Sequence, residues 1–236
     1  MSDVERSKEA AGRAAAAEVA DGMVLGLGTG STVAPFLEAV ADRIREEGLS
    51  LRGVPTSEET AVRARQLGIP LTDLDTDPVL DLAVDGADEV DPALRLVKGG
   101  GGALLREKIV AGAARRVVIV VGQGKRVEVL GRSFLLPVEI LPFGATVTMR
   151  KVSALGCQPF LRTRGEEPAA RPFATDNGNW ILDCRFPEGI ADPEDLHGRL
   201  LAIPGVLEAG LFLGLCQTLI EGRPDGTVEV IQRDEA

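Results

Sequence analysis

The first half of the chain alternates short apolar runs with longer segments of helical periodicity. Apolar runs this short fit buried strands better than helices. Alternation of strands and helices is typical of a mostly parallel sheet covered by helices, which predicts an α/β, Rossmann-like domain. Strands are expected at 23–27, 49–55, 81–84, 94–97 and 117–121, and helices at 2–20, 32–47, 57–67 and 103–114.

Several of these helices carry boundary residues. Ser2 followed by Glu5 matches a capping box, in which each side chain bonds the backbone N–H of the other residue. Ser57 is expected to cap the third helix. Gly48 and Gly68 are expected to end the second and third, because glycine readily adopts the left-handed conformation.

After Gly131 the pattern changes to strand, helix, two strands, helix and strand, which is typical of a ferredoxin-like α+β unit. These elements are expected at 137–141, 145–155, 158–162, 179–186, 193–201 and 206–212. A final hairpin, 215–232, is expected to return to the first domain. We therefore predict a Rossmann-like catalytic domain of residues 1–130 plus 213–236, and a smaller ferredoxin-like domain of residues 131–212.

Charge and composition exclude several classes of function. The formal net charge of −10 over 236 residues disfavours nucleic acid and anionic membrane as partners. The N-terminus is charged where a signal peptide is apolar, which predicts a cytoplasmic location. The wide spacing of Cys157, Cys184 and Cys216 supports neither a disulfide framework nor a zinc site. The single histidine, His197, is expected at a surface or helix-terminal position.

The segment Gly26–Thr32 joins a strand to a helix and suits a phosphate, because glycines permit close approach and a helix N-terminus attracts anions. It is no dinucleotide fingerprint, since Ser31 stands at the third glycine position, which argues against a nicotinamide dehydrogenase. The alternative is a tight turn in which Thr32 only caps the helix.

The segment Asp85–Glu89 follows another strand and holds three carboxylates, which could bind sugar hydroxyls or move protons. A solvated turn is the alternative. The segment Lys98–Gly102 precedes a helix that carries Glu107, and its glycines suggest close approach to a ligand. Periodicity alone places Leu105 and Ile109 on the apolar stripe of that helix and leaves Glu107 exposed.

Taken together, these segments resemble the type A ribose-5-phosphate isomerases. GLGTGST, DLAVDGADEVD and LVKGGGGALLREKIVA are similar to the signature loops of that family and occur in the same order, and PVEILPFG, TDNGNWILD, IPGVLEAGLF and PDGTVEV are similar to further family segments. The resemblance implies an isomerase of ribose 5-phosphate and ribulose 5-phosphate in the pentose phosphate pathway of carbohydrate metabolism. It also implies no organic cofactor, no metal, and a homodimer or homotetramer.

Carried over by position, the resemblance implies Glu107 as the general base and Lys98 as the stabiliser of negative charge on the substrate oxygen. Asp85 and Asp88 would hold sugar hydroxyls, and Asp85 would assist ring opening or proton transfer between oxygens. The implied substrate-binding set is Lys8, Thr29, Gly30, Ser31, Thr32, Asp85, Gly86, Ala87, Asp88, Lys98, Gly99, Gly100, Gly101 and Lys125.

The chain departs from the family pattern at two places. Gln123 and Gly124 precede Lys125 where the family usually has an acidic residue and a serine, which bears on the phosphate role of Lys125. Leu215 and Cys216 replace a common Ala-Asp pair, which bears on packing or assembly.

Two other functions stay open from the sequence. An isomerase or epimerase of a related aldose phosphate would use the same base and phosphate loop. A non-catalytic sugar-phosphate sensor could keep the glycine loops, although the presence of Glu107, Lys98, Asp85 and Asp88 argues against it.

Overall fold

The computed structural model describes residues 1–165 and 170–233. The chain divides into two compact units. The first unit consists of residues 1–87, 106–126 and 214–236, and the second unit of residues 88–105 and 127–213. Residues 88–105 thus pack with the second unit, whereas the expected boundary at residue 130 places them in the first domain. The boundaries of independently folding domains stay a prediction.

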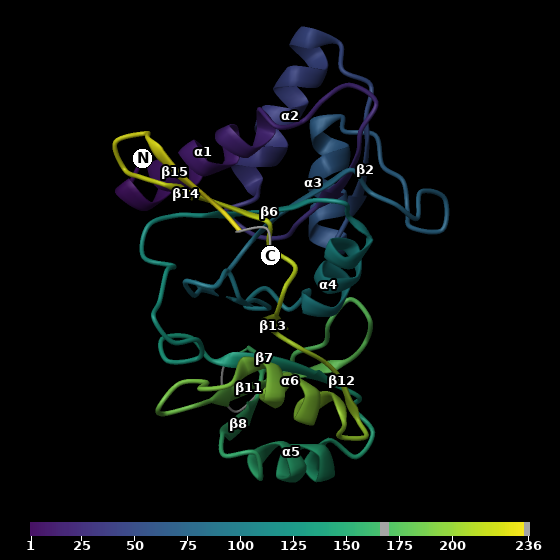
Figure 1. Ribbon diagram of the computed structural model, residues 1–236. Helices are drawn as coiled ribbons and strands as arrows, with labels where there is room; N and C mark the ends of the chain where they lie inside the picture. The colour runs from purple at the N-terminus through teal and green to yellow at the C-terminus, as the bar shows by residue number, and fades with distance from the viewer. Residues whose placement is uncertain (166–169, 234–236) are drawn as a thin grey trace. The chain divides into compact units, whose positions relative to one another are not determined.

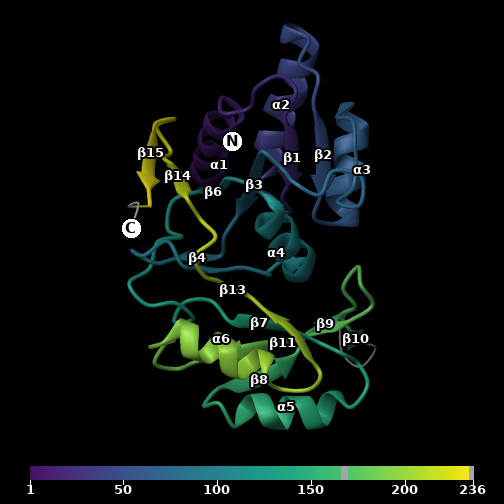
Figure 2. The ribbon, with the colours of Figure 1, turned by 45° about the vertical axis from the view of Figure 1, so that its right-hand side comes forward.

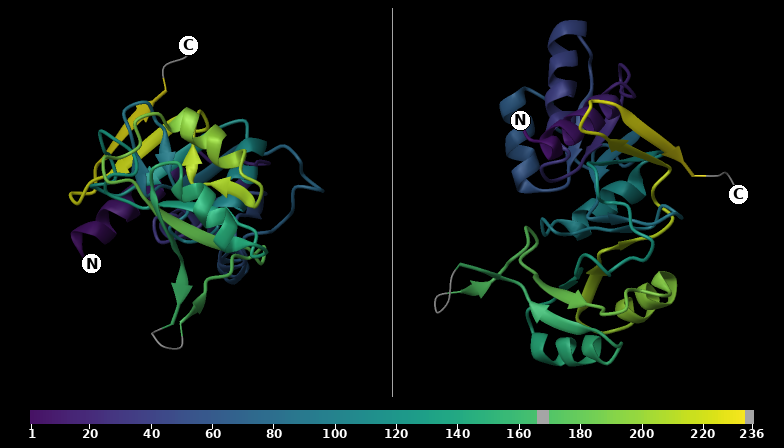
Figure 3. Two further views of the ribbon diagram at one scale, coloured as in Figure 1. Left: turned by 90° about the horizontal axis from the view of Figure 1, so that it is seen from below. Right: turned by 90° about the vertical axis from the view of Figure 1, so that its left-hand side faces the viewer.

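A six-stranded sheet forms the centre of the first unit (Figures 1 and 2). Its strands are β1 (Val24–Leu27), β2 (Arg52–Pro55), β3 (Leu82–Gly86), β6 (Val117–Val121), β14 (Thr218–Gly222) and β15 (Val228–Gln232). They are ordered β15-β14-β6-β3-β1-β2, and all neighbours are parallel except the hairpin β14–β15. This confirms the predicted Rossmann-like sheet and the return of the C-terminal hairpin, which Figure 3 shows in yellow.

Strand order reverses at β1, because β2 lies on one side of it and β3 on the other. Loops at such a switch point commonly hold ligands at the carboxyl ends of the strands. Every residue of β1, β3 and β6 is buried, as expected for parallel strands covered on both faces. The loops that follow β1 and β3 therefore start from firmly packed strands.

Four helices lie close to their predicted positions: α1 (Asp3–Ala16), α2 (Ala34–Glu47), α3 (Glu58–Leu67) and α4 (Leu104–Ala113). The capping box of Ser2 and Glu5 is present, Ser57 caps α3, and Gly48 and Gly68 end α2 and α3 in the left-handed conformation. α1 ends four residues before the expected Ala20. Thr32 does not cap α2, because the cap position is occupied by Val33.

The second unit contains a four-stranded antiparallel sheet ordered β12-β7-β11-β8. Its elements are β7 (Leu136–Ile140), α5 (Ala145–Ser153), β8 (Gln158–Leu161), β11 (Trp180–Arg185), α6 (Pro193–Leu201) and β12 (Val206–Ala209). The order of elements and strands is that of the predicted ferredoxin-like unit. His197 lies on α6 with its Nδ1 4.0 Å from Oε1 of Glu208.

Two smaller sheets complete the second unit. One joins β4 (Glu89–Val90), β5 (Leu96–Val97) and β13 (Leu211–Phe212), and the other pairs β9 (Thr163–Arg164) with β10 (Arg171–Pro172). Only β5 and β13 fall within predicted strands. Among the residues that the structure describes, no helix has the length and apolar character needed to span a membrane.

Candidate functional site

The glycine-rich loop after β1, residues 28–32, lies against the end of β3 and is called the first loop below. The N–H of Gly28 donates to the carbonyl oxygen of Val84 (2.9 Å), and the N–H of Thr29 donates to Oδ1 of Asp85 (3.2 Å). The same Oδ1 accepts the N–H of Gly86 (2.7 Å). A Cβ at residue 28 would collide with the Asp85 carboxylate, so this close approach requires glycine.

A cluster of hydroxyl groups holds the first loop in place; it consists of the side chains of Thr29, Thr56, Ser57 and Thr60. Oγ1 of Thr29 lies 2.8 Å from both Thr56 Oγ1 and Ser57 Oγ, and 3.2 Å from Thr60 Oγ1. Thr60 also donates to the carbonyl oxygen of Gly28 (2.9 Å). Thr56, Ser57 and Thr60 are not among the predicted site residues, although three hydroxyl residues so close together after β2 could have indicated them.

Three other predicted site residues of the first unit lie in the first loop or directly after β3. Thr32 lies beside Gly86, with its Cβ 3.7 Å from where a Cβ on Gly86 would be. Gly30 is exposed and has a positive φ of 102°. Ala87 is half-buried directly after β3. The first loop and the end of β3 therefore bring together most of the residues predicted around the phosphate and Asp85.

Lys8 reaches the first loop from α1. Its Nζ donates to Oγ of Ser31 (2.8 Å), and both residues line a cavity of about 610 Å³ in the first unit. Lys125 follows β6 in a half-buried position, and Gly122 of the same loop packs against Lys8. A cation and a hydroxyl group held together beside a helix start are suited to a phosphate.

Glu107 on α4 is buried, with only 5 % of its surface exposed. The helix buries Leu104, Glu107 and Val110, whereas Ile109 is 53 % exposed. The periodicity-based expectation of an apolar stripe through Leu105 and Ile109 was therefore wrong, and Glu107 occupies the inner face instead. A buried carboxylate is costly unless it is paired or hydrogen-bonded, so Glu107 differs from an ordinary surface glutamate.

The second glycine-rich loop, residues 98–102, belongs to the second unit and is called the second loop below. Oδ2 of Asp88 accepts the N–H of Gly100 (2.9 Å), and the N–H of Asp88 donates to the carbonyl oxygen of Val97 (2.8 Å). Gly99 has a positive φ of 105°, whereas Gly100 and Gly101 are exposed. Asp88 therefore holds the second loop through its side chain, and its backbone is bonded to the residue directly before that loop.

Lys98 begins the second loop and is itself buried, with 4 % of its surface exposed. Its N–H donates to the carbonyl oxygen of Gly210 (2.9 Å), and its Nζ lies 5.3 Å from the centre of the Phe212 ring. The ring face attracts the ammonium group and limits its freedom. Lys98 is thus a positioned cation rather than a mobile surface lysine.

The chain is similar to proteins of one family. The family model of ribose 5-phosphate isomerase A (phosphoriboisomerase A) matches residues 52–226. A ribose-5-phosphate isomerase A from Roseiflexus castenholzii is 52% identical over 213 residues, which are 90% of this chain and 89% of that protein.

This chain belongs to the ribose 5-phosphate isomerase A family. A solved ribose 5-phosphate isomerase A from Methanocaldococcus jannaschii matches with a TM-score of 0.89 and 40% identity, covering 95% of this chain and 97% of the other. A second solved structure, a D-ribose-5-phosphate isomerase in complex with phospho-erythronic acid, matches with a TM-score of 0.92 and 37% identity over 99% of this chain and 100% of the other.

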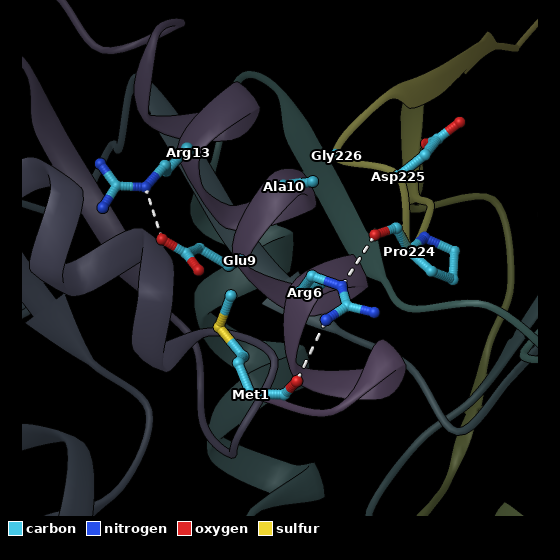
Figure 4. A pocket seen from close by; sticks show the side chains of 8 residues that line it. All are labelled: Met1, Arg6, Glu9, Ala10, Arg13, Pro224, Asp225 and Gly226. Carbon is cyan, nitrogen blue, oxygen red and sulfur yellow. Dashed lines mark hydrogen bonds and ion pairs between the residues drawn. The ribbon is translucent and has the colours of Figure 1, made fainter.

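Another cavity of this ribose 5-phosphate isomerase A family member lies between α1 and the turn of the β14–β15 hairpin (Figure 4). It measures about 250 Å³, and its arginines are already engaged. Arg6 donates to the carbonyl oxygens of Met1 and Pro224, and Arg13 pairs with Glu9 at 3.0 Å. It contains none of the predicted site residues. Within residues 1–165 and 170–233 there is no cluster of side chains that could hold a metal ion.

Proposed function

We propose that this chain is an aldose-ketose isomerase that interconverts D-ribose 5-phosphate and D-ribulose 5-phosphate in the non-oxidative pentose phosphate pathway. The observation that carries the proposal is the buried carboxylate of Glu107 on a helix whose inner face is otherwise apolar. Membership of the ribose 5-phosphate isomerase A family supplies the substrate.

Glu107 would act as the base that moves the proton between carbons. It takes the proton from C2 of the open-chain aldose, an enediolate forms, and the proton returns at C1 to give the ketose. Removing a proton beside a carbonyl requires stabilisation of the resulting negative charge. Lys98 would supply it, because its buried ammonium group is held in place by Phe212.

Asp85 and Asp88 would bind the sugar hydroxyls, because ionised carboxylates accept strong hydrogen bonds. Asp85 would also assist ring opening or move the proton between the substrate oxygens. The remaining backbone contacts would come from Gly86, Ala87 and the glycines of the second loop. These roles rest on the family resemblance, and the bonds that Oδ1 of Asp85 accepts from the N–H groups of Thr29 and Gly86 are compatible with them.

The phosphate group would bind the first loop, Lys8 and Lys125. The bond between Lys8 and Ser31 beside a cavity supports this role, since a phosphate oxygen could take the place of the serine hydroxyl. Phosphate binding supplies energy far from the reacting carbons, which improves positioning of C1 and C2. A cytoplasmic location belongs to the same proposal, and so does assembly as a homodimer or homotetramer, which rests on the family resemblance.

The test is turnover of ribose 5-phosphate by purified protein in EDTA, with Glu107→Gln and the matched control Glu59→Gln. Glu59 is an exposed glutamate on α3, so the control makes the same chemical change outside the proposed site. We expect Glu107→Gln to lower kcat about 10²–10⁴-fold and to keep the wild-type melting temperature, while Glu59→Gln keeps full activity.

Each component of the proposal has a result that contradicts it. Near-normal kcat in a folded Glu107→Gln variant refutes the role of the base. A folded wild type that does not convert ribose 5-phosphate refutes the substrate. Profiling other aldose phosphates then separates a related isomerase or epimerase from a sensor that binds sugar phosphates without turnover.

A further inference from the structure

Arg162 lies directly after β8 in the second unit and forms a two-pronged ion pair with Asp183 on β11. Its Nε donates to Oδ2 of Asp183 (2.9 Å) and its Nη2 donates to Oδ1 (2.5 Å). Both side chains are largely buried, with 15% and 19% of their surfaces exposed. A paired fork of this kind fixes the plane of the guanidinium group as well as its position.

The remaining nitrogen of Arg162 binds the second loop. Nη1 donates to the carbonyl oxygens of Gly99 (3.0 Å) and Gly100 (3.1 Å), which are 63 and 62 positions away in sequence. Phe173 adds a contact on the same side, because its backbone N–H donates to the Arg162 carbonyl oxygen (2.8 Å) and its ring packs against Gly102. The second loop is thus held from the ferredoxin-like sheet.

One peptide group of the second loop is held at both ends. The carbonyl oxygen of Gly99 accepts from Arg162, and the N–H of the same peptide, on Gly100, donates to Asp88. In a trans peptide the C=O and N–H groups point in opposite directions. The next peptide also turns its oxygen to Arg162, so the N–H of Gly101 is directed away from the arginine.

Glycines cannot fix these peptide directions by themselves. Gly100 and Gly101 are exposed and have the largest backbone freedom of any residue type. Arg162 supplies the missing constraint from one side and Asp88 from the other. A positive charge at the carbonyl end also polarises each peptide and strengthens its N–H as a donor.

We propose that Arg162 and Asp183 are positioning residues that set the peptide directions of the second loop, and through them the placement of Asp88 and Lys98 for the reaction. The consequence for catalysis rests on the proposed function, whereas the order of the loop does not. Arg162 acts through the loop and is assigned no contact with the substrate.

The experiment compares Arg162→Gln, Arg162→Lys and Asp183→Asn with Arg164→Gln as the matched control. Arg164 lies over the same Phe173 ring, 4.4 Å from its centre, and is exposed. We expect Arg162→Gln to lower kcat about 10–100-fold with a smaller change in KM. Asp183→Asn should act in the same direction, and Arg162→Lys should recover only part of the loss because it lacks the fork. Arg164→Gln should match the wild type.

Two further measurements separate positioning from a general loss of structure. Hydrogen exchange of the Gly100 amide should accelerate about 10-fold or more in Arg162→Gln, while amides of β7 and β11 keep their protection. Millimolar guanidinium should restore part of the activity of Arg162→Ala, and sodium chloride at equal ionic strength should not.

Wild-type kcat and wild-type exchange at Gly100 in Arg162→Gln overturn the proposal. Loss of protection throughout the second unit overturns it as well, because the pair would then only stabilise the fold. If the wild type fails to isomerise ribose 5-phosphate, the proposed function fails, and the exchange of Gly100 still tests the positioning role.

Discussion

Both glycine-rich loops are held in one conformation by hydrogen bonds, but the side chains that form these bonds differ between them. The first loop is held by hydroxyl groups of residues 56, 57 and 60, which lie between the end of β2 and the first turn of α3, and by the Asp85 carboxylate on β3. The second loop is held by long or charged side chains, with Arg162 at its oxygens and Asp88 at a nitrogen. Hydroxyl side chains are short, so the first loop depends mainly on close packing, whereas the second loop depends mainly on long or charged side chains.

This difference predicts which changes each loop tolerates. We expect a loop held by close packing to lose its conformation when an atom is added between the loop and the residues that support it. A loop held by charged side chains should tolerate small added groups better, because the ends of those side chains can move.

The largest effect is expected from Gly28→Ala in the first loop. The new Cβ would lie 2.6 Å from the carbonyl oxygen of Val84 and closer still to the Asp85 carboxylate, so the backbone and this carboxylate must both shift. We expect kcat/KM to fall about 100-fold and stability to fall by about 1–3 kcal/mol. Steady-state kinetics and urea unfolding measure these changes.

The control for this variant is Gly112→Ala on α4. A Cβ at residue 112 meets no atom within 4 Å, and alanine favours helix over glycine by about 0.8–1.0 kcal/mol. Gly112→Ala should therefore be fully active and slightly more stable. Wild-type kinetics in Gly28→Ala would contradict close packing as the basis of the first loop.

The equivalent change in the second loop, Gly100→Ala, should have a smaller effect. Its Cβ would lie 2.9 Å from Oδ1 of Asp88 and 3.0 Å from Cζ of Phe134, and both atoms are ends of movable side chains. We expect about a 10-fold loss of kcat/KM and a change in unfolding free energy below about 1 kcal/mol, since adaptable sites absorb added volume. A loss equal to that of Gly28→Ala would remove the distinction between the loops.

A third prediction removes one hydroxyl from beneath the first loop. Thr60→Val keeps the shape of the side chain but leaves the carbonyl oxygen of Gly28 without its donor from residue 60. We expect a loss of about 1–2 kcal/mol in unfolding free energy, because a buried hydrogen bond is broken. Thr60→Ser keeps the hydroxyl and should lose clearly less; equal losses in both variants would assign the effect to packing.

The last prediction concerns the thiols of the two units. Burial raises the pKa of the Cys216 thiol in the first unit to about 12, from 9.0. In the second unit, a hydrogen bond with Cys157, and then burial, raise the pKa of Cys184 well above its usual value. The folded protein therefore keeps the Cys216 proton in a pH range where the unfolded chain releases it.

The stabilisation linked to Cys216 is complete below pH 9 and is lost as the pH rises toward 12. Between pH 8 and pH 10 this one group should lower the unfolding free energy by about 1.4 kcal/mol. Unfolding of the wild type and Cys216→Ala at both pH values measures the difference, and Cys216→Ala should lose about that much less. Equal losses would show that the thiol does not titrate in this range.

The sequence allowed prediction of the six-stranded and the four-stranded sheet, because strand–helix alternation and the ferredoxin-like order of elements can be recognised from local patterns of apolar residues. It failed at Glu107, where periodicity gave the inner face to Leu105 and Ile109. An apolar stripe marks the face that hydrophobic packing prefers, and the buried carboxylate of Glu107 departs from that rule. Only the family resemblance assigned Glu107 a role.

The supports of the loops were beyond prediction for different reasons. Thr56 and Thr60 follow β2 closely, so their hydroxyl-rich segment was visible, but its partner Thr29 lies 27 and 31 positions earlier. Arg162 lies in segment 127–213 of the second unit, whereas the glycines that it holds lie in segment 88–105. No local sequence pattern distinguishes this arginine from any other arginine that follows a strand. Contacts of this kind follow from the three-dimensional order of strands.

The interrupted first unit also has a consequence for synthesis on the ribosome. β6 is a run of five buried apolar residues, and its partner on one side, β14, lies close to the C-terminus. α1, the first helix made, packs so closely against β14 that Gly222 has no room for a side chain beside Ser7. On the ribosome, β6 therefore lacks its partner on that side until residues 218–222 have left the exit tunnel, and an unpaired apolar strand edge is a site where chains can aggregate.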